Sequence, residues 1–131
     1  MNPYFTVNDS EHFTFYRIPK LLFTDEIYQT VSTDAKMLYG LLLDRLSLSE
    51  KNDWKDEHGR VYQYFTIHQA QELLHFGHEK VCRLFAELDA ADLIERRRQG
   101  RGKANRIYLK SLPKSPIIGI PEVRESEGNK T

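Results

Sequence analysis

The most constraining feature of the sequence is a pair of short helical patterns separated by only three residues. Thr66 is a residue type that caps helix N-termini, and apolar side chains recur at helical spacing over residues 67–75. The segment His75-Phe76-Gly77 interrupts this pattern, and a second helical pattern covers residues 78–91. The positions of this second helix predicted to face the core are Val81, Leu84, Phe85 and Leu88. Two helices joined this closely are typical of a helix-turn-helix.

Two predicted strands follow the helix pair directly. They cover residues 93–98 and 106–110, and Gly100 and Gly102 lie in the turn between them. Asp92 precedes the first strand, and we expect it in the left-handed conformation, which aspartate tolerates better than most residues. The order helix, turn, helix, β-hairpin predicts an α+β fold of the winged helix-turn-helix type.

The N-terminal segment is predicted to add a second β-hairpin to this fold. We expect it over residues 4–18, because aromatic and β-branched residues flank the turn-forming segment Asn8-Asp9-Ser10. Residues 20–30 are dense in apolar side chains, and we expect a buried short helix or helical turn there.

A longer helix and a short strand connect this segment to the helix pair. Ser32 or Thr33 is predicted to cap a helix over about residues 33–50, whose wide apolar face indicates a central packing helix. A polar loop follows, and we expect Trp54 within it to fold back onto the core. Residues 61–65 are β-formers and are predicted to be a strand.

The charges of the chain are distributed unevenly. Residues 1–95 carry 9 basic and 16 acidic side chains, a balance of −7, whereas residues 96–114 carry 8 basic and no acidic side chains. The formal net charge of zero therefore conceals a local cationic block. Such a block on a polar domain is typical of a polyanion-binding site, although a solvated basic strand has the same composition.

Composition and length exclude several classes of protein. A single cysteine, Cys82, excludes an internal disulfide and favours a reducing cytoplasm. The longest aliphatic run, Leu41-Leu42-Leu43, is far shorter than the about 20 residues of a membrane-spanning helix, and no signal-peptide pattern is present, so we expect no membrane partner. We expect one domain over residues 1–113, with residues 114–131 as a flexible linker or tail.

The exposed face of the 78–91 helix is predicted to enter a major groove of double-stranded DNA. The polar residues expected on it or in its first turn are His78, Glu79, Lys80, Arg83 and Glu87. Lys80 and Arg83 are types that bind guanine edges or phosphate, and Glu79 is a type that accepts from cytosine N4. The same residues also suit a solvated helix surface, but the basic hairpin beside them favours DNA.

The hairpin is predicted to supply the second half of the interface. Strand alternation places Arg96 and Arg98 on one face and Arg97 on the other. The hairpin residues predicted to contact DNA are Arg96, Arg98, Gln99, Arg101, Lys103, Asn105 and Arg106. The glycine-containing turn is not a P-loop, because it lacks the GxxxxGK[ST] spacing and no helix follows it.

Other chemistry finds no support, so we expect no enzyme, no metal site and no cofactor. The spacing of His75, His78 and Cys82 suggests zinc, but a fourth ligand is missing, and Cys82 is better interpreted as a partly buried core residue. The polar loop lacks the calcium-binding pattern, and its acids suit plain solvation. These acids are Asp53, Asp56 and Glu57. No nucleophile elbow or dinucleotide motif occurs.

Three segments of the chain resemble the N-terminal domain of the plasmid replication initiator A family (RepA-N). They are FYRIPKLLFTDEIY at residues 15–28, STDAKMLYGLLLDRLSLSEKNDWKDEHGRVY at 32–62 and LIERRRQGRGKANRIYLK at 93–110. The combination of DRLSLS, NxWxDExGRVY and RQGxGKxNRIY is far more distinctive than a helix-turn-helix, and the resemblance covers about residues 13–113.

The resemblance implies a winged-helix domain, similar to one in the DnaD primosome proteins, that binds repeats in a plasmid replication origin and starts replication with host machinery. It also implies a homodimer and, in longer relatives, a further domain after a linker. The residues at family-like positions are Lys80, Arg96, Arg98, Gly100, Gly102, Lys103, Asn105 and Arg106. The departures from the family pattern are Gly77 for a serine-like cap, Asp92 for glycine and Ala104 for proline.

Two other functions fit the same fold. A winged-helix transcriptional repressor also needs only site-specific duplex binding, and a winged helix can instead bind a protein partner. We expect a homodimer formed through the N-terminal hairpin, whose aromatic rings exceed what a small hairpin needs, unless those rings cap the core. These rings are Tyr4, Phe5, Phe13, Phe15 and Tyr16.

Overall fold

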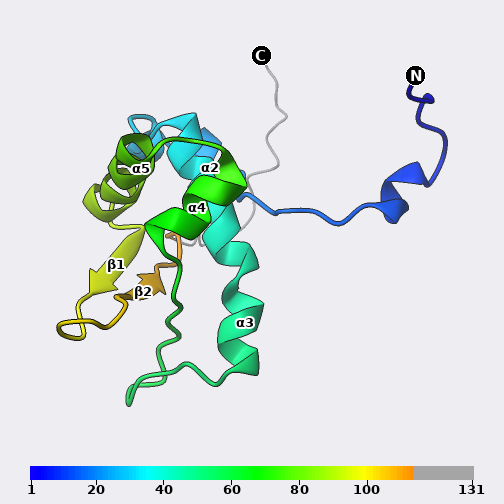
Figure 1. Ribbon diagram of the computed structural model, residues 1–131. Coiled ribbons are helices and arrows are strands. Elements are labelled where there is room, and N and C mark those ends of the chain that lie inside the picture. Colours follow the sequence, from blue (N-terminus) through cyan, green and yellow to red (C-terminus); the bar gives the residue numbers. More distant parts are fainter. Residues whose placement is uncertain (114–131) are drawn as a thin grey trace.

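Three helices and a β-hairpin form the body of the molecule in this computed structural model, which describes residues 1–113 (Figure 1). Helix α2 (Thr33–Asp44) packs against α5 (His78–Ala90), and α4 (Ile67–Leu74) packs against α5 as well. Strands β1 (Ile94–Arg97) and β2 (Arg106–Leu109) form an antiparallel hairpin, the wing. The shorter elements are η1 (Asp9–His12), α1 (Leu21–Thr24), η2 (Glu26–Tyr28) and α3 (Leu46–Lys51). The predicted α+β winged helix-turn-helix is confirmed.

Local capping signals set the helix boundaries much as predicted. The Ser32 hydroxyl accepts a hydrogen bond from the Ala35 amide at 3.1 Å and caps α2. Thr66 and Gln69 form a reciprocal capping box at the start of α4. Gly77 caps α5 without a side chain, and Asp92 has the expected left-handed conformation, with φ 61°.

The single helix expected over residues 33–50 is interrupted at Arg45, which separates α2 from α3. The Arg45 guanidinium donates to the Tyr64 carbonyl at 2.9 Å and lies 4.4 Å from the centroid of the Phe65 ring. These contacts draw Arg45 toward the segment that precedes α4. The helical periodicity of the sequence carries no information about such a distant contact.

The strand expected over residues 61–65 is reduced to two isolated bridges, Val61 with Lys55 and Gln63 with Ile107. The Gln63 amide donates to the Ile107 carbonyl at 2.9 Å and its carbonyl accepts from the Ile107 amide at 2.8 Å. The buried Gln63 side chain also donates to the Leu42 carbonyl at 2.9 Å. Gln63 therefore joins the outer edge of β2 to α2.

The predicted N-terminal β-hairpin over residues 4–18 is wrong. Within these residues the only regular element is η1, and Asn8 precedes it with φ 71°. The Asp9 carboxylate accepts from the amide and hydroxyl of Thr6, at 2.6 and 2.8 Å. This closes a tight turn instead of a strand pair. An isolated two-stranded hairpin is marginal in water, and here no sheet or helix lies beside it to cover one face.

Residues 1–17 form an N-terminal arm that projects away from the body (Figure 1). Its aromatic rings contact one another edge-on, Phe5 with Phe13 and Phe13 with Phe15, and all are exposed. The arm joins the body at Ile18, which lies against Gly40 of α2. A Cβ at residue 40 would come within 2.7 Å of the Ile18 side chain, so this packing requires glycine.

Residues 20–30 are only partly buried. Leu22 and Tyr28 are in the core as expected, but Phe23 and Ile27 are more than half exposed. Trp54 folds back, but only to pack edge-on against the half-buried Tyr64 at 5.0 Å, and it does not reach the core as predicted. Among residues 1–113, no helix has the length and apolar character needed to cross a membrane. The predicted linker, residues 114–131, lies outside the described residues.

Candidate nucleic-acid interface

A tight turn orients α5 relative to α4. His75 takes the left-handed conformation with φ 60°, and its amide donates to the Gln71 carbonyl at 2.8 Å, which ends α4. Gly77 is extended and begins α5. The three-residue break in the helical pattern is therefore the turn of the helix-turn-helix, and α5 occupies the place of the recognition helix.

The buried face of α5 matches the prediction. Its four core side chains are at most 2% exposed, and the Phe85 ring lies 6.5 Å from the ring of Phe65. They are Val81, Leu84, Phe85 and Leu88. Burial of this face fixes which side of α5 points outward.

Two polar residues predicted on the free face of α5 instead contact the start of α2. The Lys80 ammonium lies 2.9 Å from the Asp34 carboxylate and 3.9 Å from the Phe76 ring centroid. The Glu87 carboxylate accepts from the Ser32 amide at 2.8 Å and from the Ser32 hydroxyl at 2.9 Å. Lys80 and Glu87 therefore hold α5 against α2, which corrects their assignment to the opposite face.

The outward side of α5 keeps the other predicted residues. His78, Glu79 and Arg83 are exposed. The His78 ring nitrogens lie 3.7 Å from the Cys82 sulfur, and Cys82 is partly buried as expected. In the described part of the chain, no three His, Cys, Asp or Glu side chains come together in a way that could hold a metal ion.

The wing shows the predicted alternation of its arginines. Arg96 lies over the Phe85 ring, toward α5, and its guanidinium pairs with Asp89 at 2.6 Å. Arg97 lies on the other face, over the Tyr108 ring, and pairs with Glu95 at 2.6 Å. Arg96 and Arg97 are thus both neutralised locally, although only Arg96 faces the recognition helix.

The wing tip, residues 98–105, is closed by a side chain that was predicted to contact DNA. The Gln99 amide donates to the Ala104 carbonyl at 3.1 Å and to the Tyr64 hydroxyl at 3.2 Å. Gly100 and Gly102 have φ values of 132° and 77°, which other residues rarely adopt. The structure thus gives Gln99 a role in shaping the tip.

The remaining hairpin residues divide into exposed and braced ones. Arg98, Arg101, Lys103 and Asn105 are exposed. Arg106 is half-buried, and its guanidinium lies 4.2 Å from the centroid of the Tyr62 ring. The tip therefore presents three extended cations, whereas Arg106 is held against the body.

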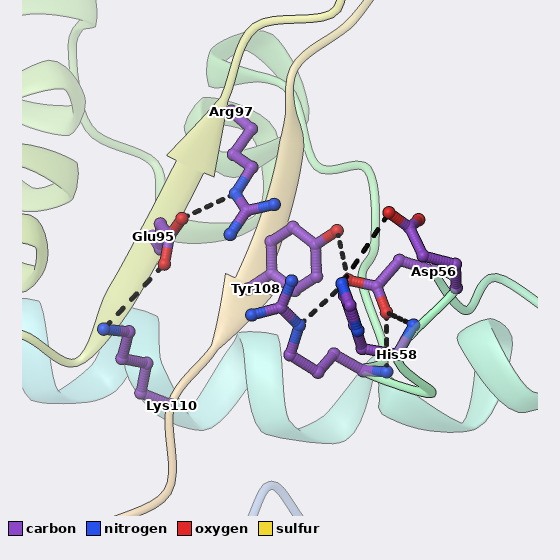
Figure 2. A network of polar contacts seen from close by, with 8 residues as sticks. Asp56, His58, Glu95, Arg97, Tyr108 and Lys110 are labelled. Carbon is purple, nitrogen blue, oxygen red and sulfur yellow. Dashed lines mark hydrogen bonds and ion pairs between the residues drawn. The ribbon is translucent and has the colours of Figure 1, made fainter.

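A polar network on the far side of the wing fixes the loop before α4 (Figure 2). The buried Asp56 carboxylate accepts from the His58 and Arg60 amides and the Arg60 guanidinium, each at 2.9 Å, and from the Tyr108 hydroxyl at 3.1 Å. Burial alone raises the pKa of Asp56, but these hydrogen bonds together hold it well below its usual range. This face of the wing therefore has a structural role.

Lys110 extends the same network toward the end of β2 (Figure 2). Its ammonium lies 3.9 Å from the Glu95 carboxylate, the pair drawn in the figure. It also lies 2.8 Å from the carboxylate of Asp92. The hydrogen bond to Asp92, and the charges of Asp92 and Glu95, raise the pKa of Lys110. Lys110 is therefore another locally paired cation of the wing.

Four exposed cations among the predicted DNA contacts stand apart from these pairs. Within residues 1–113, every ion pair formed involves other residues than these four. They are Arg83 on α5 and Arg98, Arg101 and Lys103 at the wing tip. An exposed cation without a neighbouring carboxylate keeps its full attraction for phosphate. The recognition helix and the wing tip are therefore the parts best suited to a polyanion.

Comparison with known proteins agrees with this arrangement. The family model described as replication initiator protein A (RepA) N-terminus matches residues 14–120. The chain belongs to this family. A "41 kDa protein" from Lactobacillus helveticus is 40% identical over 101 residues, which are 72% of this chain and 29% of that protein. The matched part of the chain thus spans less than a third of that protein.

Solved structures are similar over nearly the whole chain. One titled "N-Terminal domain of DNA binding protein" is 35% identical, with a TM-score of 0.72, over 97% of this chain and 94% of that one. A "Structure of Rep-DNA complex" is 35% identical with a TM-score of 0.72, covering 95% and 93%. A "Structure of MDR initiator" is 33% identical with a TM-score of 0.72, covering 97% and 100%.

Sequence reasoning missed the acidic partners in this RepA domain. Asp34 and Asp89 pair with Lys80 and Arg96, and both carboxylates come from helices. No spacing rule predicts these pairs, because one joins two different helices and the other joins a helix to a strand. Once the helix-turn-helix is packed, however, these acids decide which cations remain available.

Proposed function

We propose that this chain is the double-stranded DNA-binding domain of a plasmid replication initiator. It binds repeats in the replication origin, with α5 in the major groove and the wing tip on the phosphate backbone. The observation that carries the proposal concerns the cations of α5 and the wing: exposed Arg83, Arg98, Arg101 and Lys103 form no ion pair within residues 1–113, whereas Lys80, Arg96, Arg97 and Lys110 are paired. Family membership and the similarity to a Rep-DNA complex support it.

The two parts of the interface have different roles in this proposal. Arg83 extends from a rigid helix whose opposite face is buried, so it is suited to a guanine edge. Arg98, Arg101 and Lys103 extend from a glycine-containing tip, where phosphate is the nearest anion. The domain binds and positions DNA without catalysis, in the cytoplasm, and host proteins supply the replication machinery.

A footprint on the cognate plasmid, followed by titration of cognate and scrambled duplexes, tests the proposal. Protection of tandem repeats in the origin is expected, and protection of a single promoter operator would instead identify a repressor. Arg83→Ala should cost about 1–3 kcal/mol on the cognate duplex and little on the scrambled one. Arg101→Ala is the matched control and should weaken both duplexes alike.

Other results would contradict the assignment. If Arg83→Ala weakens both duplexes equally, α5 does not recognise bases. If Arg101→Ala weakens only cognate binding, the wing tip contacts bases and the roles are reversed. If no duplex is bound at low salt, the domain is a protein-interaction module.

We infer that the domain forms a homodimer through its N-terminal arm. Large apolar side chains are exposed along the arm, more than an isolated protein usually leaves uncovered in one segment. A groove of about 330 Å³ lies where the arm leaves the body, and its apolar lining includes Tyr16, Leu41, Leu48 and Leu73. Three polar residues, Asp44, Arg45 and Ser47, complete the lining, and in the inferred dimer the aromatic arm of the second copy packs on the apolar part of this groove.

Light scattering on the whole chain tests the dimer. Phe13→Ser in the arm should shift the protein toward monomer. Phe23→Ser is the matched control, because Phe23 on α1 is 56% exposed and Phe13 is 55% exposed. Deletion of residues 1–12 should have the stronger effect. A dimer of undiminished affinity after this deletion would refute the inference.

A further inference from the structure

One narrow stripe of α5 remains outward once its buried face and its contacts with α2 are assigned. The stripe consists of Glu79, Arg83, Ala86 and Ala90, all exposed. At 3.6 residues per turn, these four positions lie within about 60° of one another around the helix axis. They form a single line along the helix, and this line faces any duplex that α5 approaches.

Half of this exposed stripe carries only methyl groups. Ala86 is exposed at the middle of α5, between the flank tied to α2 by Lys80 and Glu87 and the flank that carries the partly buried Cys82. A longer side chain at residue 86 would hold the helix axis away from the floor of a groove. Alanine at this position permits a close approach of the helix to base edges.

The chemistry of the major groove supplies a matching group. The C5 methyl of thymine projects into the groove, where small apolar side chains such as alanine contact it. Ala86 follows Arg83 by three residues, which is about 4.5 Å along the helix axis, and consecutive bases along a strand are about 3.4 Å apart. An alanine in this register reaches the base one or two pairs from the base that Arg83 contacts.

We propose that Ala86 determines sequence specificity by packing its methyl group against a thymine methyl, one or two base pairs from the base contacted by Arg83. This inference rests on the proposed function, in which α5 enters the major groove. It assigns to a residue without charge or hydrogen-bonding capacity a share of the recognition. The DNA site then contains a T·A pair beside the pair that Arg83 recognises.

The test uses the whole chain and a duplex selected by it from a randomised library. Each thymine of that duplex is replaced in turn by deoxyuridine, which removes the C5 methyl and leaves the hydrogen-bonding edge unchanged. One replacement should weaken binding about fourfold, the effect of losing one buried methyl group. Ala86→Gly should abolish the effect of that replacement, whereas Ala90→Gly, on the same stripe near the helix end, should leave it unchanged.

Circular dichroism checks that the glycine variants fold. Ala86→Ser is the second variant, because serine makes the contact polar and lowers helix stability less than glycine does. Uracil tolerated at every position would overturn the proposal, as would a uracil effect that persists in Ala86→Gly or Ala86→Ser. The Arg83→Ala titration separates the two levels of inference. If Arg83→Ala loses cognate binding selectively and uracil has no effect, only the role of Ala86 fails. If Arg83→Ala has no selective effect, the placement of α5 fails too.

Discussion

Glu87 offers a sharp test of the structure, because the sequence alone places it toward DNA and the structure places it against α2. Its carboxylate accepts two hydrogen bonds from Ser32, the residue that caps α2. If Glu87 is bonded to Ser32 as described, the substitution Glu87→Ala removes these hydrogen bonds and lowers the stability of the protein. If Glu87 faced DNA instead, its removal would leave stability unchanged and would strengthen duplex binding, because a negative charge near phosphate would be gone.

The size of the effect follows from the geometry. A hydrogen bond to a charged group contributes about 1.5–3 kcal/mol, but Ser32 is exposed and water competes for both of its donors. We therefore expect Glu87→Ala to lower the free energy of unfolding by about 1–2 kcal/mol in total. At about 4 °C per kcal/mol for a domain of this size, Tm falls by about 4–8 °C.

Urea denaturation of a double-mutant cycle measures this contribution. Ser32→Ala and Glu87→Ala should each destabilise, and the double variant should lose less than their sum, with a coupling of about 0.5–1.5 kcal/mol. Glu79→Ala is the matched control on the exposed stripe of α5. This variant loses the favourable interaction of the Glu79 carboxylate with the N-terminus of α5, but alanine has the higher helix propensity. The free energy of unfolding therefore changes by less than about 0.5 kcal/mol.

Duplex titrations complete the comparison. Glu79→Ala should strengthen binding to scrambled DNA, whereas Glu87→Ala should leave it nearly unchanged. Additive losses in the cycle, or stronger scrambled-DNA binding by Glu87→Ala, would refute the packing of α5 against α2 described above.

Three further predictions concern charge. If the three unpaired wing-tip cations neutralise phosphates, the slope of log K against log salt is about −2.7 or steeper per monomer, and Lys103→Ala reduces it by about 0.9; a slope near zero would exclude the tip as a phosphate contact. Asp89→Asn releases Arg96 and should make the slope about 0.9 steeper, measured by titration at several salt concentrations, and an unchanged slope would show that Arg96 lies out of reach of phosphate. Because the folded-state pKa of Asp56 is lowered, its contribution to stability is present above the unfolded pKa of about 3.9 and is lost as pH falls below it. The Tm deficit of Asp56→Asn, measured from pH 7 to pH 2, should therefore shrink below about pH 4, whereas the exposed neighbour Asp53→Asn should show little deficit at any pH.

The parts of the fold that the sequence predicts are those that local forces decide. The boundaries of α4 and α5 follow from Thr66, from the turn at residues 75–77 and from apolar spacing. The wing follows from strand patterns around Gly100 and Gly102. In each case the deciding residues lie within a few positions of the element that they define.

The parts that the sequence does not predict depend on distant residues. Arg45 breaks a helical pattern because it contacts Tyr64 and Phe65, which are about 20 residues away. Glu87 lies off the free face of α5 because Ser32, 55 residues earlier in the chain, donates hydrogen bonds to its carboxylate in the packed domain. The arm has a hairpin-like composition, but a strand pair forms only where another surface covers it.

The contact of Gln63 with the outer edge of β2 allows the wing tip to vary in sequence without moving the rest of the domain. Gln63 holds Ile107 from one side and β1 holds it from the other, so the base of the wing is fixed before the chain reaches the tip. Substitutions of exposed tip residues such as Arg101 and Lys103 would then leave the body and α5 where they are. In the proposed complex, a change at such a tip residue alters the affinity for DNA of any sequence, while α5 keeps its position and its sequence preference.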